Sequence, residues 1–367
     1  MANMMDRRYF IKASCALSLL PNASLMTLPK NKRVLVLGGT GFLGPIIVEE
    51  LLKHGYSVTL FNRGKTNSHL FPKLEKIRGD RETLDGSGLK ALRQDNRHWD
   101  WVVDTWQGSS KCVADTAQLL SDRVGQYQYV STISVYDKWN KIGINENEPL
   151  NPLPGEKEAI VTDNRNAIRK TFSEKVLKQI LPDRSVFFRS HGMRGSRTTR
   201  PIHESYWQVK IKRGGDLVLP ADTTYYQITD MVSLSRFMVH CGDTHKLGAY
   251  NVCYSPFLFR DFIQSIVEST SSKVRLHYIP QSFLRANDVR LMYDHDRPPG
   301  RYRFDVSKAL EAGLQNRPFE ALLQDQLRGY YERNPKGDFV FGHPETKTMS
   351  SQREQEIIRL WQESAFA

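Results

Sequence analysis

Residues 33–44 read RVLVLGGTGFLG, and their pattern is the clearest indication of the fold in this sequence. Its first five residues are nearly all apolar, as in a parallel strand that is covered on both faces. Glycines follow at once, then Pro45 at a position that suits the start of a helix, and residues 46–52 fill that helix. Residues 57–61, SVTLF, form a second apolar strand. This order predicts the phosphate-binding unit of a doubly wound parallel sheet.

The glycine spacing carries the chemistry of this unit. Gly39, Gly41 and Gly44 fit the pattern G-x-G-x-x-G. The absence of Cβ atoms permits a tight turn and lets a pyrophosphate approach the backbone, and the helix start supplies free N–H groups. We therefore expect a dinucleotide to contact Gly38, Gly39, Gly41, Phe42, Leu43 and Gly44.

The residues after the second strand bear on which dinucleotide binds. An acid there binds the ribose 2′-hydroxyl of NAD. This chain has Asn62, Arg63 and Lys65 instead, with no acid. The two cations can pair with a 2′-phosphate, so the sequence favours NADP over NAD. After a third strand, Asp80 and Arg81 are expected beside the adenine.

The rest of the chain continues the alternation of strands and helices. Further strands are expected at 74–78, 101–104, 127–131 and 185–189, with helices between several of them. We predict an α/β fold with a right-handed, doubly wound parallel sheet, a Rossmann fold. The length of 367 residues allows two domains.

Composition and charge narrow the classes of protein. Hydrophobic residues make up 40%, which argues against disorder, and no apolar run approaches the ~18–20 residues that span a membrane. The four cysteines are too few and too widely spaced for a disulfide scaffold or a cysteine-based zinc site, and we expect no metal. The net charge of +12 leaves three interpretations open: a solvated surface, an anionic small ligand and nucleic acid. The local clusters of cations are Arg194, Arg197 and Arg200, then Lys210, Lys212 and Arg213.

The N-terminus resembles a bacterial export signal. Residues 6–12, DRRYFIK, precede a short apolar stretch, as in twin-arginine signals. We expect a signal segment at 1–28 and export to the periplasm. The alternative is an ordinary N-terminal extension of a cytoplasmic protein.

The chain as a whole resembles the extended short-chain dehydrogenases/reductases of the NAD-dependent epimerase/dehydratase group. The resemblance rests on segments 38–44, 60–66, 79–81, 130–136, 206–207, 227–230 and 303–318. It implies a dinucleotide-binding domain at 31–189 and a smaller, interleaved substrate-binding part at 190–367, from which segments near 225–255 return to the first domain. It also implies hydride transfer with a sugar, a nucleotide sugar or a similar hydroxylated small molecule.

The active-site pattern departs from that family. The resemblance places the substrate-orienting hydroxyl at Thr132 and the lysine that holds the nicotinamide ribose at Lys170. The helix that carries Lys170 is expected to bury Ile168, Phe172 and Val176. Four residues before Lys170, where the family has its catalytic tyrosine, stands Asn166. An asparagine does not exchange a proton at neutral pH.

Three interpretations of this substitution remain open. Another group acts as acid/base, with candidates His191, His203, Glu204 and Tyr206; His191 follows the sixth strand, near the expected nicotinamide. Or the protein binds a dinucleotide without turnover, or binds RNA on the same fold. Or the helix is aligned wrongly. We favour an NAD(P)-dependent reductase or epimerase and keep the non-catalytic binding protein as the alternative.

Overall fold

The computed structural model describes residues 32–83, 85–153, 165–197, 201–221, 224–289, 298–336 and 348–364, and of 201–205 only the backbone. The expected signal segment at 1–28 lies outside these residues, as do the side chains of His203 and Glu204.

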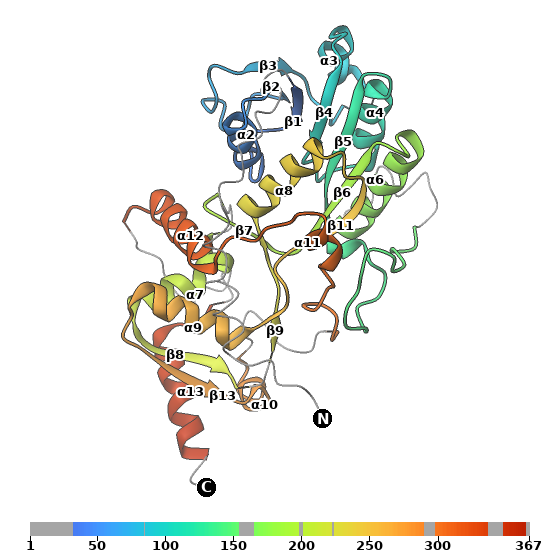
Figure 1. Cartoon of the computed structure of the whole chain (residues 1–367). Coiled ribbons are helices and arrows are strands. Elements are labelled where there is room, and N and C mark those ends of the chain that lie inside the picture. The colour runs from blue at the N-terminus through green and yellow to red at the C-terminus, as the bar shows by residue number, and fades with distance from the viewer. Residues whose placement is uncertain are drawn as a thin grey trace, which may run out of the picture.

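A seven-stranded parallel sheet forms the centre of the N-terminal part (Figure 1). Its strand order is β11-β6-β5-β4-β1-β2-β3. The order reverses between β1 and β4. Residues 34–37 of β1 pair in parallel with β2 on one side and with β4 on the other. The predicted doubly wound fold is confirmed. The strands are β1 (Arg33–Leu37), β2 (Ser57–Asn62), β3 (Glu75–Arg78), β4 (Trp99–Asp104), β5 (Val124–Thr132), β6 (Ser185–Ser190) and β11 (Gly248–Val252).

Helices cover both faces of this sheet because its strands are apolar on both sides. One face carries α2 (Gly44–Lys53), α8 (Met231–Asp243) and α11 (Ser307–Glu311). The other carries α3 (Lys90–Gln94), α4 (Ser110–Leu120) and α6 (Asn166–Ile180). The close approach of α8 requires Gly242, since a Cβ there would lie 2.3 Å from the Trp101 ring.

Helix α6 differs from its prediction in which residues it buries. Ile168 and Phe172 are buried as expected, but Val176 is only half-buried and Leu177 takes its place. The helix also buries Glu174, which the apolar pattern did not indicate. That carboxylate forms an ion pair with Arg189 of β6 at 2.6 Å, so the polar side of the helix has a partner inside the protein.

The second part of the chain forms a smaller lobe around its own aromatic core. Two parallel strands, β8 (Gly215–Pro220) and β13 (Val274–Ile279), lie against its helices. Those helices are α7 (Pro201–Arg213), α9 (Phe259–Thr270), α10 (Gln281–Ala286), α12 (Phe319–Arg333) and α13 (Ser351–Ser364). Two short pairs complete the strands: β7 (Met193–Arg194) pairs with β10 (Thr229–Asp230), and β9 (Tyr225–Tyr226) pairs with β12 (Phe257–Leu258). None of the described helices is both long and apolar enough to cross a membrane.

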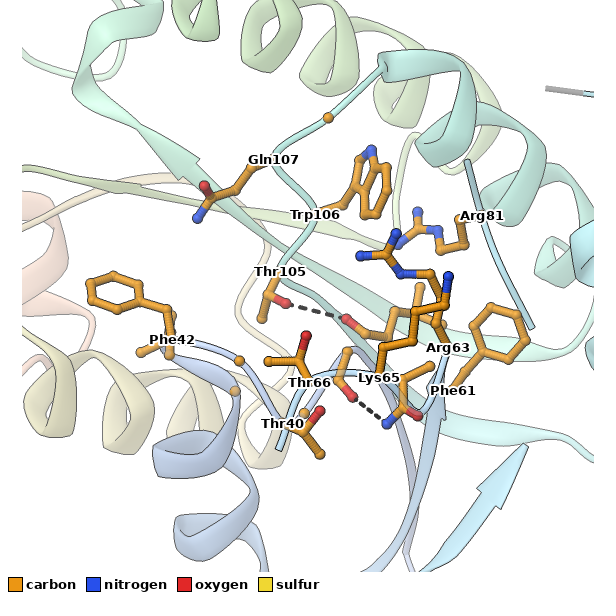
Figure 2. A pocket seen from close by; sticks show the side chains of 18 of the residues that line it. Thr40, Phe42, Phe61, Arg63, Lys65, Thr66, Arg81, Thr105, Trp106 and Gln107 are labelled. Atoms are coloured by element: carbon orange, nitrogen blue, oxygen red, sulfur yellow. Dashed lines mark hydrogen bonds between the residues drawn. The ribbon is translucent and has the colours of Figure 1, made fainter. Parts of the chain in front are cut away.

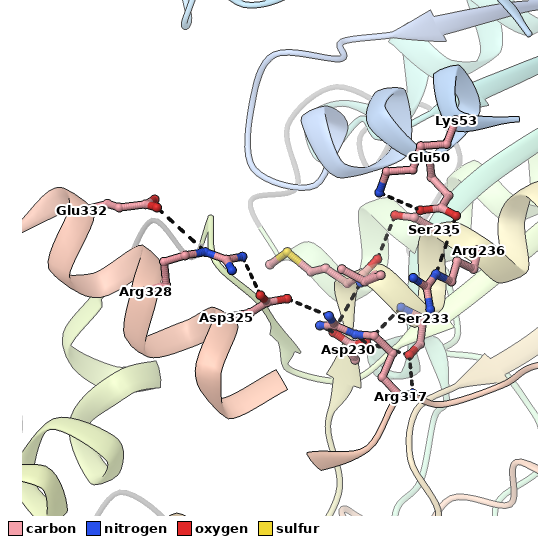
Figure 3. Close-up of polar contacts among 12 residues, drawn as sticks. Glu50, Lys53, Asp230, Ser233, Ser235, Arg236, Arg317, Asp325, Arg328 and Glu332 are labelled. Atoms are coloured by element: carbon pink, nitrogen blue, oxygen red, sulfur yellow. Dashed lines mark hydrogen bonds and ion pairs between the residues drawn. The ribbon is translucent and has the colours of Figure 1, made fainter. Parts of the chain in front are cut away.

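Arg317 ties the two lobes together (Figure 3). Its guanidinium donates two hydrogen bonds to Asp230, the residue that caps the start of α8, and a third to Asp325 of α12. Asp230 also ends β10, which pairs with β7 beside His191. One arginine therefore fixes the position of α12 relative to the sheet and to the chain that follows β6.

Candidate functional site

A cavity of about 360 Å³ lies at the carboxyl ends of the sheet strands (Figure 2). Its walls come from the residues that follow β1, β2, β3 and β4, and from Val130 of β5. This first cavity therefore opens where the strand order reverses, which is the usual place for a ligand in an open α/β sheet.

The glycine turn shapes the floor of the first cavity. Gly38 and Gly39 have φ values of +116° and +86°, which disfavour any residue with a Cβ. A Cβ on Gly44 would lie 2.7 Å from the backbone of Gly39, so α2 packs directly on the turn. A Cβ on Gly41 would meet nothing within 4 Å, because this residue faces the open cavity. The turn thus keeps backbone exposed at Gly41 for a ligand.

The start of helix α2 also faces the first cavity. Leu43 stands at the N-cap position, and its side chain makes no capping hydrogen bond to the helix. Uncapped N–H groups and the helix dipole favour a bound anion. The glycine turn and the helix start together fit the pyrophosphate of a dinucleotide.

The end of β2 contributes both structural and exposed groups. Asn62 donates to the Gly38 carbonyl at 3.0 Å, and its oxygen accepts from Gly64 and Arg78. The amide therefore holds the glycine turn to β2, a role that the sequence did not indicate. Arg63 and Lys65 line the cavity (Figure 2), and Arg63 forms an exposed ion pair with Glu82 at 2.6 Å.

Asp80 and Arg81 both line the first cavity, but their side chains differ in what they contact. Asp80 accepts from the Glu82 backbone at 3.0 Å. Arg81 is buried and donates twice to Asp104, at 2.7 and 2.8 Å. Burial opposes the charge of Asp104, yet the neighbouring guanidinium outweighs it and holds the pKa of that carboxyl below its usual value. The positive charge of Arg81 is thus neutralised inside the protein, and a contact between Arg81 and the cofactor stays a prediction.

Lys170 also takes a different position from the one expected. It is buried, and its amine donates to the backbone carbonyls of Trp106 at 2.5 Å and Val130 at 2.6 Å. Lys170 is not among the described residues that line the first cavity, whereas Trp106 and Val130 are. The amine therefore binds the backbone of two segments of the cavity wall and does not line the cavity itself. Its backbone partners are distant in sequence, so the helix pattern gave no signal of them.

Lys170 gives the stability of the protein a specific pH dependence. Burial lowers its pKa from the ordinary 10.5 to about 7, although Asp104 and Glu174 act in the opposite direction. Between these two values the unfolded chain binds a proton that the folded protein does not, so the lysine's contribution to stability rises with pH above about 7. We therefore compare the free energy of unfolding of wild type with that of Lys170→Met. The difference, wild type minus variant, should increase between about pH 7 and pH 9 by at most about 1.4 kcal/mol per pH unit. Urea unfolding of both proteins tests this; a difference that is independent of pH contradicts it.

A second cavity, of about 280 Å³, lies beyond the ends of β5 and β6. Thr132 and His191 line it, together with Trp139, Arg301 and Tyr302. Two chain segments contribute to both cavities. From the end of β5, Val130 lines the first cavity and Thr132 the second. From the segment after β6, Met193 lines the first cavity, and its neighbours Gly192 and Arg194 line the second. A ligand at the Val130 end of the first cavity would lie next to the contents of the second.

His191 is fixed in the second cavity by its surroundings. Its Nε2 donates to the Arg301 carbonyl at 2.8 Å, and its ring stacks on Tyr302 with centroids 5.0 Å apart. Thr132 accepts from the Ser134 backbone at 3.2 Å, which begins a short helix at Ile133–Val135. The structure thus brings the predicted hydroxyl and imidazole to one cavity.

The other candidates lie elsewhere. Asn166 is exposed at the first residue of α6 and is not among the described lining residues of either cavity. Tyr206 is buried in the core of the smaller lobe, where burial raises its pKa, so it is wrong as an acid/base candidate. Lys210 forms a buried ion pair with Glu354 and does not take part in an anion-binding surface. Among the described residues, no group of three or more histidine, cysteine or acidic side chains is arranged to hold a metal.

Sequence comparison matches part of the chain to a known family. Residues 34–124 match the model of the NAD dependent epimerase/dehydratase family. The chloroplast stem-loop binding protein of 41 kDa b from Arabidopsis thaliana is 26% identical over 147 residues, which are 36% of this chain and 38% of that protein. The matched region therefore spans well under half of the relative's length.

Solved structures share the fold over most of the chain. A UDP-glucose 4-epimerase superposes with a TM-score of 0.61 at 15% identity, covering 84% of this chain and all of that one. The Bordetella bronchiseptica enzyme WbmG, in complex with NAD, gives 0.60 at 17% identity over 86% and 96% of the two chains. Yeast methylglyoxal/isovaleraldehyde reductase Gre2, complexed with NADPH, gives 0.59 at 16% identity over 83% and 99%. Residues 34–124 thus carry the sequence signature of the NAD dependent epimerase/dehydratase family, and the chain has the fold of these epimerases and reductases.

Proposed function

We propose that the first cavity binds a nicotinamide dinucleotide. The observation that carries this proposal is the open space above Gly41, beside the uncapped start of α2. Residues 34–124, which match the family model, include this turn. Two proteins of the same fold are described with NAD and with NADPH bound, which supports the same class of cofactor here.

Within that class we propose a preference for NADP. Two cations, Arg63 and Lys65, line the first cavity after β2 and support binding of a 2′-phosphate; the nearby Glu82 pairs with Arg63. We expect Arg63→Ala to weaken NADP binding by about 2- to 150-fold and to spare NAD, because hydrogen bonds to charged groups contribute roughly 1.5–3 kcal/mol and the exposed pair with Glu82 offsets up to about 1 kcal/mol of that. Glu82→Gln should act in the opposite direction, since it frees Arg63 and removes a negative charge. Calorimetric titration measures both.

The control for this prediction is Lys73→Ala, which removes an exposed cation that does not line the first cavity. It should leave both affinities unchanged. Equal weakening of NAD and NADP in Arg63→Ala, or no weakening of either, refutes the proposed preference.

We further propose that the protein is an oxidoreductase that acts on a hydroxylated small molecule in the second cavity. A bound nicotinamide dinucleotide supplies hydride exchange. Thr132 orients the substrate hydroxyl, and His191 exchanges its proton; among the described residues that line this cavity, the other proton-exchanging side chains of this kind are Tyr226 and Tyr302. Lys170 supports this arrangement indirectly, because it holds the Trp106 and Val130 backbone between the two cavities.

RNA binding is a second candidate because the Arabidopsis relative is named as a stem-loop binding protein. Exposed aromatic rings among cations would favour it. Trp101 and Trp207 are buried in the cores of the two lobes, so these two rings cannot stack on bases.

Two measurements on the purified protein test the proposed function. Mass spectrometry identifies any nucleotide that copurifies, and nicotinamide absorbance follows turnover on a panel of polyols, sugars and nucleotide sugars. We expect a bound or bindable dinucleotide and turnover of at least one substrate. Tight binding of a stem-loop RNA that dinucleotides do not displace, with no turnover, favours the second candidate.

A further inference from the structure

Arg194 and Arg301 are among the described residues that line the second cavity, and no aspartate or glutamate is among them. Arg194 donates to the Met193 carbonyl and to the Tyr226 hydroxyl. Cations that line a cavity attract an anionic ligand.

Arg301 differs from three largely buried arginines in its partners. Arg81, Arg189 and Arg317 each donate at least two hydrogen bonds to a carboxylate. Arg301 lines the second cavity and forms no ion pair with any described residue. An anionic ligand in this cavity would supply the oxyanion partner that the described residues do not provide.

The guanidinium is nevertheless held in place. It lies 5.2 Å from the ring centroid of Trp139 and 5.8 Å from that of Tyr302, so two aromatic rings stabilise its charge. The carbonyl of the same residue accepts from His191 Nε2. Arg301 is therefore positioned next to the residue proposed to exchange the substrate proton, and its planar fork suits an oxyanion.

We propose that the second cavity binds a compact, hydroxylated small molecule that carries a phosphate or carboxylate group, and that Arg301 binds this oxyanion. The inference rests on the proposed function for the identity of the second cavity as the substrate site. The volume of about 280 Å³ lies just below the roughly 300–1,000 Å³ of pockets for drug-sized ligands, so a group the size of a monosaccharide fits better than a larger one.

Calorimetric titration with glucose 6-phosphate, glucuronate, glucose and inorganic phosphate tests the proposal. NADP-saturated protein is used, so that anions do not enter the first cavity. We expect wild type to bind inorganic phosphate and at least one of the two anionic sugars more tightly than glucose, and Arg301→Gln to lose about 10- to 100-fold of that anion affinity. Comparing the phosphate with the carboxylate probe identifies the oxyanion.

Two variants control for charge and for folding. Arg303→Gln removes a nearby arginine that stacks on Tyr225 and does not line the second cavity; it should keep the anion preference. Arg301→Lys keeps the positive charge and should retain part of the anion preference. Equal anion affinity in wild type and Arg301→Gln, or no binding of any anionic probe to wild type, overturns the proposal.

The proposed function can fail separately from this inference. The dinucleotide titration is done first, and no binding there refutes the proposed function alone. The anion titration is then repeated on the unliganded protein, where a loss confined to Arg301→Gln still assigns the anion to the second cavity.

Discussion

Gly41→Val protein is expected to lose affinity for NAD and NADP alike, by about 100-fold or more, while it folds normally. The valine side chain would occupy the open space above the turn, where a Cβ meets nothing within 4 Å. A pyrophosphate displaced from two backbone N–H groups loses hydrogen bonds worth roughly 1.5–3 kcal/mol each. Calorimetric titration of both dinucleotides measures the loss, and thermal unfolding checks the fold.

Gly44→Ala is the contrasting variant. Its Cβ would lie 2.7 Å from the Gly39 backbone, so the helix must shift and the variant should lose thermal stability. The two variants should therefore differ: Gly41→Val impairs dinucleotide binding, whereas Gly44→Ala impairs stability. Unchanged dinucleotide affinity in well-folded Gly41→Val protein rules out this turn as the binding site.

His191→Gln protein is expected to turn over substrate about 10²–10⁴-fold more slowly than wild type, the usual contribution of a positioned proton-transfer group. Its affinity for the dinucleotide should not change, because His191 lines the second cavity and is not among the described residues that line the first. Initial rates on the panel substrate that wild type converts, with a separate dinucleotide titration, measure both effects.

Two variants decide between this assignment and the family's usual one. His98→Gln removes an exposed histidine and should leave turnover unchanged. Asn166→Tyr restores the family's tyrosine; because Asn166 is exposed and lines neither cavity among the described residues, it should not raise turnover. Faster turnover in Asn166→Tyr, or full activity in His191→Gln, contradicts the role of His191. Absence of turnover in wild type on the whole panel, with the dinucleotide bound, favours a binding protein.

The sequence predicted those features that depend on neighbouring residues. The apolar run 33–37, the glycines and Pro45 are adjacent in the chain, and local geometry alone makes them a strand, a turn and a helix. The doubly wound sheet followed because alternating strands and helices allow few other topologies.

Features that depend on distant contacts could not be read in this way. Lys170 meets carbonyls 64 and 40 residues away, and Arg81 meets a carboxylate 23 residues away. Arg301 carries no motif, and only the folded chain brings it beside Trp139 and His191. For Lys170 and Arg81 the sequence predicted a contact with the cofactor, but their partners in the folded chain could not be predicted from neighbouring residues.

We propose above all that the cavity above the glycine turn binds a nicotinamide dinucleotide. Calorimetric titration of purified wild-type protein with NADP and with NAD is the direct test. We expect saturable binding at one site per chain, tighter for NADP than for NAD. No detectable binding of either dinucleotide to folded protein that is free of copurified nucleotide would contradict it.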